Sequence, residues 1–407
     1  MPSSFTWLDY SEHERRKMLD VIELFGERTT RDELGLGGIR DAFADLLFPG
    51  TSTIQTRAKY FLFVPWIYSM LEEKEVPSSA VAMKARRLET ELMNALSASE
   101  DTAGVIGGRA KENLQRLPSN IYWQGLLAWG IRLFPGSQDE YHRSLDLFYT
   151  RRGARRARHS EFEGESHGDL ALHNWHSGLP SVPTGFPEQA SFALESDEAE
   201  YLRERILGHC SQSLLAVLVR DRAVVDGIDF AWELTIDLPP GLREQLDHGQ
   251  NFSEILLGAQ LLYNLMLAES RDWQEVSDDY RERLTLWWKL ISSRLTELKA
   301  WDRRRFWQIV YHSNPRVSSR ARNFVNSWVD LVVQSKTLPT LLKSNHARQL
   351  IEHREIQLKG GLARLRSPRA LELWTGAAGD GQIDLRWTAA KRIVADIVNG
   401  LEEPNDA

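Results

Sequence analysis

Arginine side chains are concentrated in residues 302–369, which we call the basic segment. It holds fourteen basic and four acidic residues, a local balance of +10 in a chain whose net charge is −7, so the remaining residues carry −17. Guanidinium groups pair with phosphate through parallel hydrogen bonds, so this asymmetry indicates a surface for a polyanion or an acidic–basic interface within the protein. The candidate phosphate-binding residues are Arg303, Arg304, Arg305, Arg316, Arg320 and Arg322.

Aromatic residues are interleaved with these arginines, at Trp301, Phe306, Trp307, Tyr311, Phe324 and Trp328. Aromatic rings stack on unpaired bases, so the mixture is typical of a nucleic-acid groove. The alternative is that the rings form core and the arginines a solvated face, which the apolar helical stripe favours for Phe324 and Trp328. A second basic contact is predicted at Arg151, Arg152, Arg155 and Arg156.

Histidine and acidic residues crowd together between His159 and His176. Imidazole and carboxylate groups are metal ligands, which makes His167, His173 and His176 candidate ligands of a metal-dependent hydrolase or nuclease. No HExxH spacing occurs, and alternating acids are typical of a solvated loop, so we expect no metal and no other cofactor. Cys210 is the single cysteine, which excludes a disulfide framework.

Arg57 follows a short turn at residues 51–56 and precedes an apolar run. We predict that its guanidinium group is structural and joins this turn to a neighbouring helix through a carbonyl or carboxylate partner. The apolar run itself, residues 60–71, is too short to cross a bilayer, and no targeting segment precedes it, so we expect a cytoplasmic protein without membrane contact.

Helical periodicity dominates the chain, and it predicts a mainly α, multi-domain helical fold with a few short strands. Apolar stripes at helical spacing run through residues 252–266, 284–298 and 317–332, and Pro65 predicts a kink or break in a helix. Short strands are expected at residues 383–386 and at 357–358 opposite 363–364. Composition suggests an N-terminal helical domain (1–148), a loop-rich mobile linker (149–190), a middle helical domain (191–300) and a basic C-terminal helical region (301–407).

Three segments carry a resemblance to a known family. They are RDELGLGGIRDAFADLLFPGTSTIQTRAKYFLFVPWIY (31–68), NFSEILLGAQLLYNLMLAE (251–269) and RALELWTGAAGDGQIDLRWTAAKRIVADI (369–397). They resemble an uncharacterised bacterial protein family of unknown function found in genome-defence neighbourhoods, near helicases and phospholipase-D-like nucleases. The resemblance implies one subunit of a defence system and supplies no catalytic residues. The chain lacks the His-x-Lys motif of such nucleases.

The functional prediction is therefore a non-enzymatic nucleic-acid-binding or assembly subunit of a bacterial anti-phage or foreign-DNA defence system. Its expected partners are nucleic acid, DNA in particular, and defence proteins such as a helicase or a phospholipase-D-like nuclease. Two alternatives remain open: a metal-dependent hydrolase or nuclease that uses the His/Glu-rich loop, and a pure protein scaffold whose basic segment docks on an acidic surface.

Overall fold

The computed structural model describes residues 32–107, 116–161 and 173–402, and the chain divides into two compact units. Unit 1 comprises Met1–Phe43, of which residues 32–43 are described, and Asp247–Leu385. Unit 2 comprises Ala44–Leu246 and Arg386–Ala407. Each unit is thus assembled from two separate stretches of chain, whereas composition suggested four consecutive regions.

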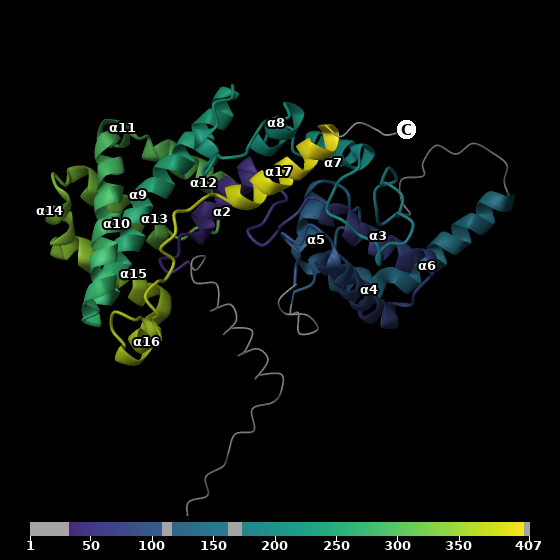
Figure 1. Ribbon diagram of the computed structural model, residues 1–407, viewed down its shortest axis with the longest axis horizontal. Helices are drawn as coiled ribbons and strands as arrows, with labels where there is room; N and C mark the ends of the chain where they lie inside the picture. Colours follow the sequence, from purple (N-terminus) through teal and green to yellow (C-terminus); the bar gives the residue numbers. More distant parts are fainter. Residues whose placement is uncertain (1–31, 108–115, 162–172, 403–407) are drawn as a thin grey trace, which may run out of the picture. The chain divides into compact units, whose positions relative to one another are not determined.

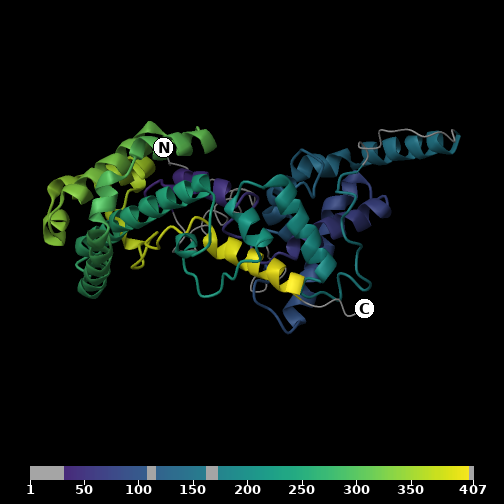
Figure 2. The same cartoon turned by 90° about the horizontal axis from the view of Figure 1, so that it is seen from above.

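Unit 2 is built from helices that enclose the apolar helix α3 (Figure 1). Residues 60–68 of α3 are all buried, and the helix packs against α4 and α5. Near the other end of the chain, α17 lies along α7 and α8 (Figures 1 and 2). The helices of this unit are α3 (Tyr60–Glu73), α4 (Ser78–Ala98), α5 (Pro118–Ala128), α6 (Gln138–Glu161), α7 (Ser196–His209), α8 (Leu214–Arg220), the short 3₁₀ helix η2 (Ala231–Glu233) and α17 (Trp387–Glu402).

Pro65 does not break the helix that contains it, because α3 is continuous from Tyr60 to Glu73. A proline inside a helix costs about 3 kcal/mol through its missing N–H and its steric clash. Burial on almost every side offsets that cost. Phe61, for example, stacks on Trp129 with ring centroids 3.7 Å apart.

Unit 1 is organised around α9, whose predicted apolar stripe at residues 252–266 is buried as expected. Indole N–H groups fix neighbouring helices to it: Trp287 donates to the Glu254 carbonyl at 2.7 Å and Trp328 to the Ile255 carbonyl at 2.8 Å. The helices of this unit are α10 (Gln274–Ser293), α11 (Leu295–Ala300), α12 (Arg303–Ser313), α13 (Ser319–Gln334), α14 (Leu338–Leu342), α15 (Asn345–Lys359), η3 (Gly360–Leu362) and α16 (Pro368–Glu372), while α2 (Gly37–Leu47) and α9 (Pro240–Ser270) contribute residues to both units.

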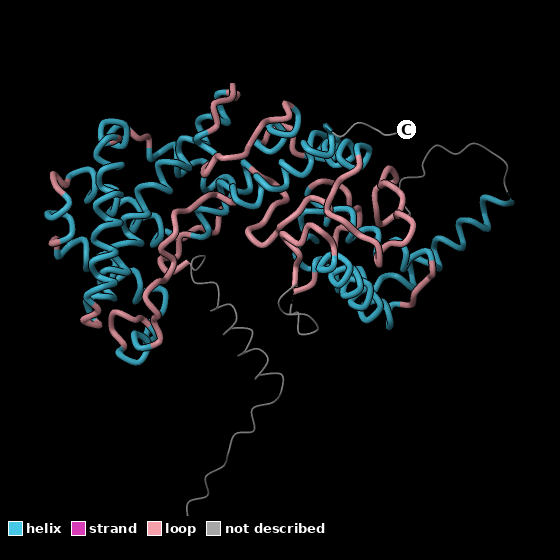
Figure 3. Tube along the Cα trace, in the orientation of Figure 1, coloured by secondary structure: helices cyan, strands magenta, loops and turns pink. Residues whose placement is uncertain are grey.

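The mainly helical fold is confirmed, but the expected short strands are absent from the described residues, which form only helices and loops (Figure 3). A single isolated bridge joins Arg132 to Trp175 there. Residues 357–358 continue α15, because Ala347, Ile351 and Glu355 place a buried helical face just before them. Gly360 then ends that helix with a φ of +55° and does not open a hairpin.

The stretch predicted as a mobile, loop-rich linker begins as a helix and is attached to α3 at two later residues, while most of its described side chains are exposed or partly exposed. Helix α6 extends to Glu161, and residues 162–172 lie outside the described part. Beyond them, Asn174 and Trp175 are buried and donate to Glu72 Oε1 at 3.0 and 3.1 Å. These contacts fix the segment to α3. No helix in the described ranges is long and apolar enough to span a membrane.

Glu89 on α4 is a fully buried carboxyl group that faces the start of α5. It accepts hydrogen bonds from the Ser119 amide and hydroxyl groups, both at 2.8 Å. Burial raises the pKa of Glu89 to about 7 because the charged form loses its hydration, and the two hydrogen bonds offset only part of this effect.

We expect Glu89 to make the protein less stable as pH rises from about 4.5 to about 7. The folded state holds this proton more tightly than the unfolded state does, so the stabilisation is complete below the unfolded pKa and lost by pH 7. The shift corresponds to about 3 kcal/mol. Glu89→Gln should remove that share of the pH slope in urea unfolding at pH 5, 6 and 7. The control Glu91→Gln, at a partly exposed site on the same helix, should keep the pH dependence of the wild-type protein. An unchanged slope in Glu89→Gln would show that Glu89 is not the group responsible.

Candidate nucleic-acid interface

Helix α12 exposes arginines because its opposite face is core. Asp302 caps the helix by accepting from the Arg305 amide at 2.9 Å, and residues 306, 307, 309 and 310 are buried. Arg304 and Arg305 consequently face solvent. Arg303 is half-buried and forms an ion pair with Asp330 of α13 at 2.7 Å, so it holds the two helices together.

Helix α13 begins at Ser319, two residues later than the predicted apolar stripe. Ser318 caps it by accepting from the Ala321 amide at 3.2 Å. Arg316 and Arg320 are four residues apart, a spacing that would place them on one side of a single helix, but Arg316 lies in the turn before α13 and only Arg320 lies in the helix. Both residues are exposed, as is Arg322, whose guanidinium group lies 5.9 Å from the centre of the Trp307 ring.

Arg316 and Arg320 line a cavity of about 340 Å³ in unit 1, together with Arg354 of α15. Arg354 is only 4% exposed, and its Nε and Nη2 donate to the carbonyls of Leu34 and Gly35 at 2.8 and 3.0 Å. Burial lowers the pKa of Arg354, and the carboxylate of Asp32 acts against this shift. Within the described chain, none of the three arginines forms an ion pair, so the cavity wall keeps its positive charge.

The interleaved aromatic residues belong to the core and offer no stacking platform. Trp301, Phe306, Trp307, Phe324 and Trp328 are all buried. Only Tyr311 of the predicted set is partly exposed. The five buried rings therefore cannot stack on unpaired bases. The groups that this surface offers to a ligand are guanidinium groups, which suit phosphate.

Other cations of the basic segment form ion pairs with carboxylates of unit 1. For these residues, the alternative of an acidic–basic interface within the protein is the one observed. Lys359 and Arg364 pair with Glu33 at 2.6 and 3.0 Å. Further pairs are Arg348 with Glu269 at 2.7 Å and Arg366 with Glu352 at 2.8 Å. The charge count therefore overstates the number of cations that a ligand can meet.

The second predicted basic contact, at Arg151, Arg152, Arg155 and Arg156, lies on α6 of unit 2. Arg152 is structural: it donates to the Glu72 carbonyl at 3.0 Å, pairs with Glu75 at 3.1 Å and lies over the Phe148 and Tyr149 rings. Arg151 is exposed and Arg155 half-buried. The Arg156 side chain lies outside what the structure describes.

The histidines of the metal hypothesis come together only in part. His173 and His176 line a cavity of about 720 Å³ in unit 2, with Arg152 and Glu72, whereas His167 lies outside the described residues. His176 Nε2 is 2.7 Å from Arg205 Nη1, which can only donate, so this nitrogen lone pair is occupied. Among residues 32–107, 116–161 and 173–402, no three His, Cys, Asp or Glu residues are placed to hold a metal ion.

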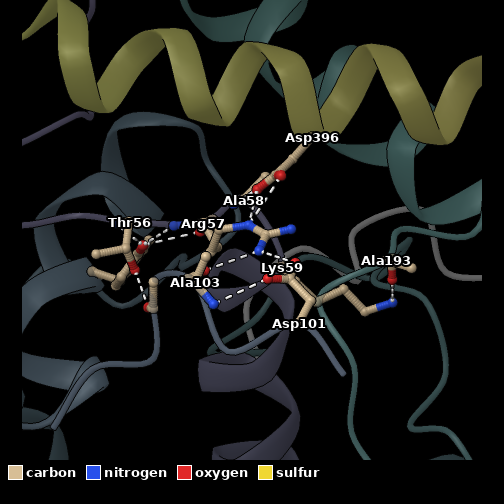
Figure 4. A network of polar contacts seen from close by, with 10 residues as sticks. Thr56, Arg57, Ala58, Lys59, Asp101, Ala103, Ala193 and Asp396 are labelled. Atoms are coloured by element: carbon tan, nitrogen blue, oxygen red, sulfur yellow. Dashed lines mark hydrogen bonds and ion pairs between the residues drawn. The ribbon is translucent and has the colours of Figure 1, made fainter. Parts of the chain in front are cut away.

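Arg57 has the structural role that we predicted. Its Nε donates to both carboxylate oxygens of Asp396 at 3.0 Å, and its Nη1 contacts Asp101 at 2.5 Å and the Ala103 carbonyl at 3.0 Å (Figure 4). The Ala58 amide also donates to Asp396, at 2.8 Å. The turn is thus joined to the middle of α17.

Residues 2–400 match a family of unknown function, DUF6361. The chain belongs to that family. The match covers nearly the whole chain and confirms the resemblance to an uncharacterised family, without assigning a reaction. No curated protein and no solved structure matches the chain significantly.

We expect Arg57→Ala to lower the free energy of unfolding by about 3 kcal/mol, because it leaves the Asp396 carboxylate, whose side chain is only 10% exposed, without its cation. Chemical denaturation would measure this loss. Arg87→Ala is the control: Arg87 also pairs with a glutamate, but its side chain is 79% exposed, so its loss should hardly change stability. Equal effects of the two substitutions would show that the Arg57 network is not a structural joint.

Proposed function

We propose that this protein is a non-enzymatic nucleic-acid-binding subunit in which unit 1 holds the phosphate backbone. The observation that carries the proposal is the pair Arg316 and Arg320, exposed on the wall of one cavity and without an ion-pair partner in the described chain. Arg304 and Arg322 add exposed positive charge along α12 and α13.

The division of labour among the cations supports this proposal over a merely solvated surface. Arg303, Arg348, Lys359, Arg364 and Arg366 are used by carboxylates of unit 1. Arg316 and Arg320 lie next to the start of α13, where the helix dipole also favours an anion. Helix dipole and side chains thus act on the same ligand charge.

Buried aromatic rings restrict the kind of recognition that we propose. With Trp301, Trp307 and Trp328 in the core, the surface offers guanidinium groups for phosphates and no rings for bases. Phosphate contacts position a nucleic acid without reading its sequence. The subunit is therefore proposed to bind DNA with little sequence preference and strong salt dependence.

The biological setting belongs to the same proposal. The resemblance to a family from genome-defence neighbourhoods supports a role in anti-phage or foreign-DNA defence. We infer that this chain holds DNA or assembles the complex, while a helicase or phospholipase-D-like nuclease performs the chemistry. The absence of a His-x-Lys motif from the sequence supports that division.

The test is the double substitution Arg316→Ala/Arg320→Ala in the full chain. Fluorescence anisotropy with duplex DNA across a salt series should show weaker binding to every sequence. The slope of log affinity against log salt should become shallower by about 0.9 for each phosphate that the variant no longer neutralises. Thermal stability should hardly change, since exposed charges contribute little to folding.

The matched control is Arg366→Ala/Arg369→Ala, which removes the same charge from exposed positions of unit 1 that do not line the cavity. It should weaken binding less than the cavity substitution does. Equal weakening would assign the effect to net charge alone, and absence of DNA binding by the unsubstituted protein would overturn the proposal. If the unsubstituted protein binds no DNA but captures a protein partner from a nuclease-treated lysate, the scaffold alternative would replace the proposal.

A further inference from the structure

We propose that the cavity bounded by Arg316, Arg320 and Arg354 is a binding site for a phosphate monoester, which on a nucleic acid is a terminal phosphate. This inference rests on the proposed function for the source of the phosphate, whereas the residues that line the cavity support the site independently. The three arginines come from three places: the turn before α13, the first turn of α13, and α15.

Gly35 and Gly38 are also in the cavity wall, and the backbone at Gly35 lies close to Arg354. Gly35 has a φ of +66°, and a Cβ there would lie 2.6 Å from Arg354 Nη2. Gly38 also lines the cavity, and a Cβ on it would meet Val317 at 3.4 Å. Glycines at these positions keep the cavity open and let two carbonyls hold the guanidinium group of Arg354 in place.

The electrostatics of the cavity favour an anion. A buried cation without a hydrogen-bonded carboxylate is costly, and Arg354 is satisfied by the Leu34 and Gly35 carbonyls alone. The neighbouring carboxylate of Asp32 is already engaged by the amides of Leu36 and Gly37, at 2.5 and 2.7 Å. A ligand with two negative charges would compensate Arg354 as well as the outer pair, Arg316 and Arg320.

Size and charge together favour a chain end over the middle of a strand. About 340 Å³ is at the lower limit of small-molecule sites, enough for a terminal phosphate and its sugar and too small for a duplex. A phosphate monoester carries a charge of about −1.5 to −2 at pH 7, whereas a backbone diester carries −1. Only the terminal phosphate of a strand can enter the cavity and reach Arg354. Phosphates in the middle of a strand can still reach Arg316 and Arg320, because these two residues are exposed at the cavity wall.

The experiment compares one oligonucleotide in three forms, with a 5′-phosphate, a 3′-phosphate or no terminal phosphate, by anisotropy with the full chain. One phosphorylated form should bind about tenfold more tightly than the unphosphorylated form, the gain expected for a charge-assisted contact. Arg316→Ala/Arg320→Ala should remove most of this preference, because the outer pair shares the terminal phosphate with Arg354, and it should weaken the binding of the unphosphorylated form as well. Arg320→Lys should retain part of it, because lysine keeps the charge but not the forked geometry. The control Arg366→Ala/Arg369→Ala should preserve it.

A parallel arm titrates a nucleoside monophosphate alone by calorimetry. Equal affinity for all three oligonucleotides would overturn the monoester site while leaving the proposed function intact. If no oligonucleotide binds but the monophosphate does, in a manner that depends on Arg316 and Arg320, the site stands and its ligand is a free nucleotide. If neither binds, the monoester site and the proposed function both fail.

Discussion

The buried carboxylate of Glu33 has to be balanced by cations, and the arrangement of unit 1 depends on how this is done. Burial alone would raise the pKa of Glu33, but Lys359 and Arg364 lower it below its ordinary value. Lys359 also pairs with the buried Glu355 at 2.8 Å, and Tyr263 donates to the same carboxylate at 2.6 Å. Two carboxylates and two cations thus form a balanced cluster that joins the N-terminal part of unit 1 to α9 and α15. Removal of any one charge would leave another buried without compensation.

This balance separates structural cations from those that a ligand can reach. Acids that are distant in sequence, such as Glu33 and Glu269, neutralise Lys359, Arg364 and Arg348. The local charge of +10 was the strongest signal in the sequence, yet a large share of it serves the fold. What distinguishes Arg316 from Arg364 is the absence of a neighbouring carboxylate among the described residues, and that depends on tertiary structure.

Sequence periodicity was reliable where one helix face meets a large core. The stripes that contain Phe252 and Phe324 are buried as predicted, because apolar residues at helical spacing have one way to reach the interior. Predictions from short patterns failed. The Gly360-Gly361 pair resembled a hairpin turn but ends a helix, and the basic block at residues 151–158, which was assigned to a linker, continues α6.

The candidate site was predictable only in its outer part. The density of arginines led to Arg316 and Arg320, although the helix start was placed too early. Arg354 was missed because it was counted as one cation among many. Its position three and seven residues after Ile351 and Ala347 is a signal for the buried face of α15, and a charged residue on such a face calls for a partner.

Arg354 and the outer arginines differ in how much freedom they have to lose. Two carbonyls fix the guanidinium group of Arg354, and it lies 5.6 Å from the centre of the Phe324 ring, so its orientation exists before any ligand arrives. Arg316 and Arg320 are exposed and would give up side-chain entropy in the binding that we propose. Exposed charges attract a polyanion from a distance and add salt-dependent affinity, whereas a fixed buried charge sets the geometry of the bound group. The packing of α13 against α15 would therefore matter to the proposed binding as well as to stability, because Arg320 on α13 and Arg354 on α15 line one cavity.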